Sequence, residues 1–115
     1  GPFHSSLMKA VAAEFEADLG AISWRAPKFP VYHNVGNAPA TLEEIPQRLL
    51  QQLYSPVNWT GAIPAIRHHG DLAVEFGPGK VIAGLNKRID KSLPVVGTGD
   101  LASLQSAISR IQGGE

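Results

Sequence analysis

His4 is a residue of a type that can do acid–base chemistry. It stands between Gly1-Pro2-Phe3 and a stretch with apolar residues at helical spacing. An imidazole can accept a proton from a neighbouring hydroxyl or thiol near neutral pH. Such a base serves a nucleophile, but the G-x-S-x-G turn that exposes a serine between a strand and a helix occurs nowhere in the 115 residues. Judged on residue types alone, His4 is either one half of a catalytic pair or a structural or solvent-exposed histidine.

Other stretches of the sequence contain residue types that can bind phosphate or metals. The stretch 77–80 (Gly-Pro-Gly-Lys) lacks both the spacing and the Ser or Thr of a P-loop, which favours a tight turn between a strand and a helix. His68 and His69 precede Asp71, but adjacent helical residues point about 100° apart and do not chelate as an i, i+4 pair does. We expect that group to be a solvated helix end, and we expect His33 to be structural.

The composition is ordinary for one globular domain, with 43% hydrophobic and 17% charged residues. Ten basic side chains balance ten acidic ones, so no strong field would attract nucleic acid or an anionic membrane. The absence of cysteine excludes disulfides and thiolate metal sites, and the apolar runs are too short to span a bilayer. The sequence also shows no signal-peptide pattern, and we expect a cytoplasmic protein.

Apolar periodicity and turn residues predict five helices and three short strands. The helices are expected over 5–19, from Thr41 to 53 behind a Thr41–Glu44 capping box, over 57–69, over 81–89, and from Asp100 to Gly113-Gly114. The strands are expected over 31–35, 72–76 and 93–96. This order is typical of an α/β layer with a mostly parallel sheet. Because parallel sheets normally have both faces covered and contain more strands, the predicted sheet is incomplete.

Motifs along the whole chain, at matching intervals, resemble malonyl-CoA:acyl-carrier-protein transacylases. They are Gly1-Pro2-Phe3-His4-Ser5, the stretch 52–59 (Gln-Leu-Tyr-Ser-Pro-Val-Asn-Trp), the stretch 76–81 (Phe-Gly-Pro-Gly-Lys-Val), and Asn34-Val35. The similarity corresponds to the C-terminal portion of such an enzyme, about its last third. The resemblance implies an α/β-hydrolase-like parallel sheet layer in a large subdomain, with a ferredoxin-like small subdomain inserted in it. Residues 1–115 would be the C-terminal segment of the large subdomain, incomplete alone, without the small subdomain and the nucleophile segment.

The resemblance also implies a reaction and residue roles. In ping-pong transfer, a serine takes malonyl from coenzyme A and the phosphopantetheine thiol of acyl carrier protein then accepts it. His4 would be the base, and a main-chain carbonyl at Gln52 would hold its other ring nitrogen. Phe3 would help to exclude methylmalonyl, with a modest ceiling of roughly 1–3 kcal/mol. No permanently bound cofactor or metal is implied; the partners would be malonyl-CoA, acyl carrier protein and the N-terminal remainder of the enzyme.

The nucleophilic serine, the arginine that pairs with malonate and the oxyanion-hole donors all lie upstream in that family. The chain alone is therefore expected to be inactive. Bacterial fatty-acid synthesis is the favoured setting, and the polar ending Gly113-Gly114-Glu115 mildly favours a free-standing enzyme. One alternative is the acyltransferase segment of a polyketide or polyunsaturated-fatty-acid synthase. Another is a non-catalytic α/β module that binds a carrier protein.

Overall fold

The computed structural model describes residues 1–113, so Gly114 and Glu115 of the predicted chain ending lie outside the described part. The chain divides into two compact units, Gly1–Ala65 and the part from Ile66 onward. Helix α3 (Trp59–Arg67) spans the boundary between them. In the described residues no helix is both long enough and apolar enough to cross a bilayer.

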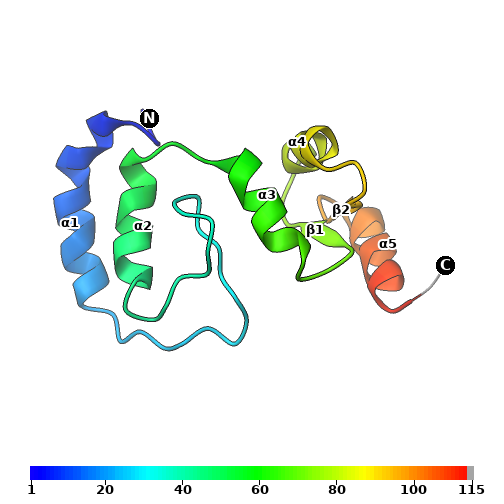
Figure 1. The fold of residues 1–115 in the computed structure, drawn as a ribbon, viewed down its shortest axis with the longest axis horizontal. Coiled ribbons are helices and arrows are strands. Elements are labelled where there is room, and N and C mark those ends of the chain that lie inside the picture. Colours follow the sequence, from blue (N-terminus) through cyan, green and yellow to red (C-terminus); the bar gives the residue numbers. More distant parts are fainter. Residues whose placement is uncertain (114–115) are drawn as a thin grey trace. The chain divides into compact units, whose positions relative to one another are not determined.

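The first unit is built on two helices that pack side by side, α1 (Lys9–Gly20) and α2 (Ile45–Tyr54) (Figure 1). A 3-10 turn, η1 (Ser6–Met8), leads into α1, which ends at Gly20 as predicted. The core contains Ala12, Leu19 and Leu50, with five partly buried side chains packed against it: Phe15, Trp24, Leu49, Leu53 and Tyr54.

Only part of the apolar stripe predicted over 5–19, which covers η1 and α1, is buried. Met8, Ala12 and Leu19 are buried, whereas Leu7 and Val11 are 73% and 49% exposed. One partner helix covers a single line of contact along α1, so the outer part of a wide apolar stripe remains exposed.

Helix α2 begins irregularly, as the position of Pro46 predicts. The glutamate half of the predicted capping box is present, because Thr41 N–H donates to Glu44 Oε2 at 2.9 Å. The chain then forms a turn, and regular helix starts at Ile45. Gln52 and Leu53, whose carbonyl oxygens contact His4, lie in the last turn of this helix.

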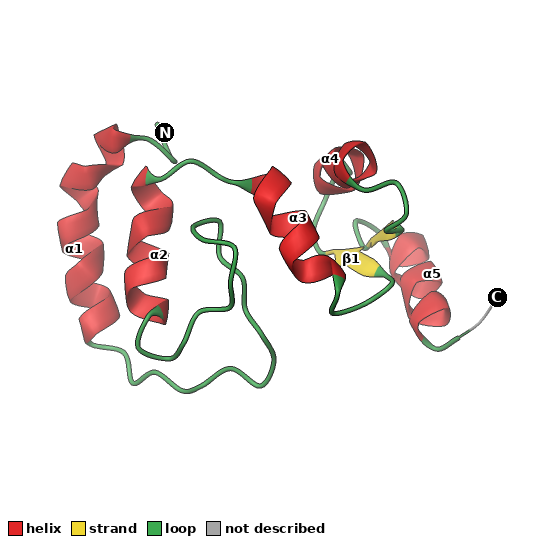
Figure 2. Cartoon of the chain, in the orientation of Figure 1, coloured by secondary structure: helices red, strands yellow, loops and turns green. Residues whose placement is uncertain are grey.

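The predicted strand over 31–35 is wrong: these residues lie in the long connection between α1 and α2, drawn as loop in Figure 2. A strand needs a neighbour that takes its backbone groups in a regular ladder. The carbonyl oxygens here accept from unrelated partners instead: Val31 from Ala40 N–H (3.1 Å), Asn34 from Asn58 N–H (3.4 Å), and Val35 from Arg48 Nη1 (2.7 Å).

The second unit holds the other two predicted strands, which are shorter than expected. Strands β1 (Ala73–Glu75) and β2 (Val95–Gly97) form a two-stranded parallel sheet with Val74 opposite Val96. The turn after β1 is the predicted glycine turn, since Gly77 and Gly79 have φ of +115° and +95°. Helices α4 (Val81–Ile89) and α5 (Leu101–Ile111) follow the two strands. The chain is thus rich in helix with a small parallel sheet, which is compatible with part of an α/β fold.

The predicted inward faces of α4 and α5 are largely exposed in the described structure. Asn86 and Ala107 are buried on these helices, while six large apolar residues are at least 38% exposed: Val81, Leu85, Leu101, Leu104, Ile108 and Ile111. A sheet of two short strands is too narrow to cover both helices, so the sequence periodicity located the apolar stripe but not its cover.

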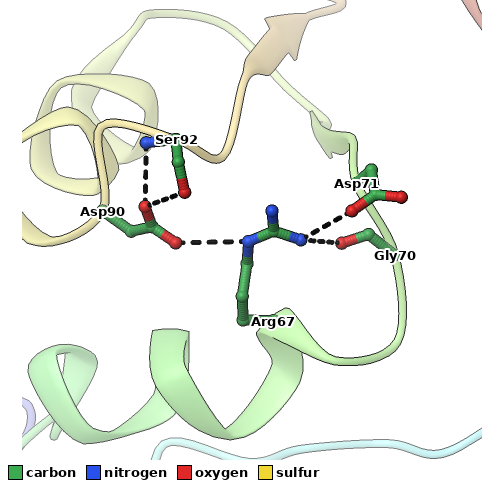
Figure 3. Close-up of polar contacts among 5 residues, drawn as sticks. All are labelled: Arg67, Gly70, Asp71, Asp90 and Ser92. Carbon is green, nitrogen blue, oxygen red and sulfur yellow. Dashed lines mark hydrogen bonds and ion pairs between the residues drawn. The ribbon is translucent and has the colours of Figure 1, made fainter.

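Polar contacts hold the connections of the second unit. Arg67 Nη1 donates to Gly70 O at 2.7 Å and to Asp71 Oδ1 at 2.9 Å, and its Nε lies 3.3 Å from Asp90 Oδ2 (Figure 3). The Ser92 hydroxyl and N–H donate to Asp90 Oδ1 and lower the pKa of Asp90. This network joins the end of α3 to the loop that follows α4.

The capping box of α5 predicts an acid-sensitive contribution to stability. The Ser103 N–H donates to Asp100 Oδ1 at 2.7 Å, and it is the main cause that lowers the Asp100 pKa below its ordinary value of 3.8. A carboxyl group with a lowered folded-state pKa stabilises the fold fully above its unfolded value and loses that contribution as the pH falls through the folded value. Asp100→Asn is therefore expected to reduce the loss of stability measured by chemical unfolding between pH 5 and pH 3. Asp18→Asn, at an exposed position on α1, is the matched control, and an equal effect of the two variants would contradict the prediction.

Candidate active site around His4

The backbone at His4 is held in an unusual conformation. Its φ of +63° is the only positive value at a non-glycine residue in the described part, and such a conformation costs about 1–3 kcal/mol. The His4 N–H donates to Leu53 O at 2.8 Å, and the Ser5 hydroxyl donates to Pro2 O at 2.7 Å. Figure 1 shows the N-terminal segment beside the C-terminal end of α2. These contacts fix the turn that presents the imidazole.

The His4 ring is oriented by the main chain of Gln52. His4 Nδ1 lies 2.9 Å from Gln52 O. A carbonyl oxygen can only accept, so Nδ1 carries a hydrogen, and in the neutral ring Nε2 therefore keeps the lone pair that can take a proton. Among the described residues, no carboxylate lies within ion-pair distance of the ring. The geometry is therefore that of a neutral base oriented by a carbonyl, and it is the contact that the resemblance implied.

Gln52 itself is contacted by a second histidine. His33 Nδ1 lies 3.3 Å from Gln52 Oε1, and His33 is 8% exposed. Its Nε2 is buried without a hydrogen-bond partner in the described structure. The predicted structural role of His33 is consistent with this buried position beside the Gln52 side chain.

Asn34 is the site residue that the motifs indicated only indirectly. Its Nδ2 lies 3.3 Å from His4 Nδ1, while its Oδ1 is buried and has no partner in the described structure. One feature of the sequence could have indicated that Asn34 belongs to a site: His33 and Asn34 form a polar pair between Tyr32 and Val35. That signal could not identify His4 as the neighbour, because the two residues are far apart in the chain.

Phe3 directly precedes His4 and is 57% exposed, so its ring is available to a molecule bound at this turn. The residue lies in the turn that η1 follows. Phe3 and His4 are therefore neighbours in the same turn.

The other polar groups have structural explanations. The rings of His68 and His69 are 4.1 Å apart and tilted by 37°, and the Asp71 carboxylate is bound by Arg67. A pocket of about 490 Å³ in the second unit is lined by residues of β1, β2, α4, α5 and the glycine turn, among them Glu75, Lys80 and Asp100. It contains no histidine in its lining. In the described chain no cluster of three or more His, Asp or Glu side chains could hold a metal ion.

Comparison with known proteins gives a consistent result, although no family model matches the sequence. A malonyl CoA-acyl carrier protein transacylase from Staphylococcus aureus (strain COL) is 41% identical over 95 residues, which is 81% of this chain and 31% of the relative. The transacylase of the same name from Salmonella typhimurium is 36% identical over 111 residues, 95% of this chain and 36% of the relative. The solved complex of a type II PKS acyl-carrier protein with its malonyl-transacylase matches with a TM-score of 0.87 and 38% identity, over 95% of this chain and 36% of that one.

The fold of the chain is thus that of a part of the acyltransferase structures that it matches. More narrowly, the chain matches a C-terminal portion of malonyl CoA-acyl carrier protein transacylase. It spans about a third of the length of the curated relatives.

Proposed function

We propose that this chain supplies the histidine of a malonyl-CoA:acyl-carrier-protein acyltransferase of bacterial, cytoplasmic fatty-acid biosynthesis. The observation that carries the proposal is the 2.9 Å contact between His4 Nδ1 and Gln52 O, within a chain that matches malonyl transacylases. That contact leaves Nε2 as the basic atom, as proton transfer from a nucleophile requires.

The reaction is proposed to proceed in two half-reactions. His4 Nε2 takes the proton of a serine hydroxyl, whose oxygen attacks the malonyl thioester carbon, and the protonated ring returns this proton to the departing sulfur of coenzyme A. The phosphopantetheine thiol of the carrier protein then loses its proton to Nε2 and attacks the malonyl-serine ester. The serine oxygen leaves with that proton, so base and nucleophile are regenerated. No permanently bound cofactor is needed for these steps.

The remaining groups are proposed to come from the N-terminal remainder of the enzyme. They are the serine, the arginine for the malonyl carboxylate and the oxyanion-hole donors, none of which is assigned to residues 1–115. On this view the chain is the C-terminal segment of an α/β-hydrolase-like large subdomain, and a ferredoxin-like small subdomain lies outside it. A base without a nucleophile has nothing to act on, so the isolated chain is inactive.

Phe3→Ser provides a test of acyl selectivity at this site. The smaller side chain would leave room for one methyl group, so discrimination against methylmalonyl-CoA should fall about 10-fold, within the roughly 1–3 kcal/mol available from a methyl contact. The measurement is the ratio of kcat/KM for malonyl-CoA and methylmalonyl-CoA. Phe29→Ser, in an exposed loop position, is the matched control, and a ratio unchanged by Phe3→Ser would contradict the role.

A polyketide pathway is the second candidate. It is favoured by the match to a malonyl-transacylase in complex with a type II PKS acyl-carrier protein. The chemistry at His4 would be the same in both settings, and the carrier protein alone would differ.

The test of the proposed function is malonyl transfer by the full-length protein that contains this chain. Radiolabelled malonyl-CoA should label a holo fatty-acid carrier protein, and a holo polyketide carrier protein assayed in parallel decides between the two pathways. Absence of label on both carriers would contradict the proposal.

A further inference from the structure

The His4 ring nitrogen Nδ1 has two neighbours that place opposite demands on it. Gln52 O, at 2.9 Å, requires a hydrogen on Nδ1. Asn34 Nδ2, at 3.3 Å, is an amide donor and requires a lone pair on the same nitrogen. A neutral imidazole nitrogen has one or the other, and the imidazolium has hydrogens on both nitrogens. The contact with Gln52 O is the shorter of the two, and a main-chain carbonyl cannot exchange its acceptor for a donor. Nδ1 of His4 therefore carries a hydrogen.

The other end of the Asn34 amide points to the same solution. Its Oδ1 is buried and has no hydrogen-bond donor in the described structure, so this oxygen makes no stabilising hydrogen bond in its present position. Turning the amide by 180° exchanges Oδ1 and Nδ2, which differ little in size. The oxygen then faces the hydrogen on His4 Nδ1, and no hydrogen bond is lost at the buried end.

We infer that Asn34 is a positioning residue whose Oδ1 accepts a second hydrogen bond from His4 Nδ1–H. The inference deepens the proposed function and rests on it for its catalytic meaning. Together with Gln52 O, the asparagine oxygen holds the ring and stabilises the imidazolium, because a hydrogen bond to a charged donor is stronger than one to a neutral donor. The imidazolium is the form that arises in each half-reaction, so Asn34 favours both proton transfers.

No nearby charged group substitutes for this oxygen. On the elements that pack against η1, Lys9 Nζ lies over the Tyr54 ring at 5.8 Å from its centroid, and Arg48 binds Glu44 and Val35 O. His33 contacts Gln52 Oε1 rather than the His4 ring. In the part of the chain that the structure describes, the acceptors at Nδ1 are therefore neutral oxygens.

The experiment uses the full-length protein with ¹⁵N-labelled histidine. The neutral His4 ring should carry its hydrogen on Nδ1, and Asn34→Ala should move the midpoint of the ring's titration to lower pH by about half a unit to one unit. The acid limb of the kcat/KM profile should move with it. Asn34→Asp, of nearly the same shape, should move both to higher pH, since a carboxylate accepts more strongly. The matched control is Asn37→Ala, in the same loop, whose amide contacts Asn58.

Each possible result of this experiment either supports or overturns the inference about Asn34. A hydrogen on Nε2 in the neutral ring, or a midpoint that Asn34→Ala raises or leaves unchanged, would overturn the inference. If Asn34→Ala does not fold, the wild-type hydrogen position and Asn34→Asp give the answer, and an unmoved midpoint in Asn34→Asp would overturn it. The NMR titration does not require turnover. A failure of malonyl transfer would therefore contradict the proposed function, whereas the titration alone tests the contact between Asn34 and His4.

Discussion

Replacing His4 by alanine is expected to lower malonyl transfer by the full-length protein about 10²–10⁴-fold. The imidazole is the group whose Nε2 is free to take a proton, because Gln52 O occupies the Nδ1 side of the ring. In the proposed mechanism, removing the imidazole leaves the serine and the incoming thiol without the base that His4 would supply. The measurement is kcat and kcat/KM with malonyl-CoA and holo carrier protein.

The matched control for this variant is His68→Ala. His68 lies after α3, and its ring centroid is 4.1 Å from that of His69. Turnover close to wild type is expected for the control. Unchanged turnover in His4→Ala, or an equal loss in both variants, would remove His4 from the role of base.

Leu50→Ala is expected to destabilise the protein by about 2–5 kcal/mol. Leu50 is 6% exposed and lies with Ala12 and Leu19 in the core between α1 and α2. The shorter side chain removes apolar contacts and leaves a cavity. Helix α2 also carries the carbonyls that hold His4, so the loss should be accompanied by weaker ordering of the site. Denaturant unfolding measures the change.

Gln47→Ala is the control on the same helix. Gln47 is exposed, and its replacement should change the free energy of unfolding by no more than about 0.5 kcal/mol. A similar small change in Leu50→Ala would mean that the α1–α2 contact is not the core of this unit.

Local signals in the sequence predicted the local features of the fold well. Asp100 begins the last helix because its side chain and that of Ser103 satisfy each other's backbone donors, a pattern contained in four consecutive residues. Gly77 and Gly79 adopt the positive φ values that only glycine tolerates readily. Both features depend on neighbours within the same short stretch.

Features that depend on distant neighbours were predicted less well. The segment 31–35 has the residue types of a strand, but its carbonyls find single partners rather than an adjacent strand. The apolar stripe of α5 was found, yet Leu101 and Ile111 are exposed because a two-stranded sheet does not reach them. Secondary-structure propensity and apolar periodicity locate a helix or strand, but they do not identify the residues that pack against it.

The candidate site shows the same division. His4 and Gln52 could be paired only through the resemblance to a family, since 48 positions separate them. Asn34 was known as a match in sequence, but its contact with the His4 ring required the folded chain. The roles of these residues in catalysis remain predictions to be tested.

Formation of the malonyl-enzyme tests the central claim most directly. Full-length wild-type protein is mixed rapidly with radiolabelled malonyl-CoA in the absence of carrier protein. It should acquire covalent label with a rate constant higher than kcat, and it should pass this label to holo carrier protein that is added afterwards. His4→Ala should acquire label more slowly by about the factor lost in turnover, because in the proposed mechanism the same base serves both half-reactions. Labelling of His4→Ala at the wild-type rate, or no covalent label on the wild-type protein, would contradict the account.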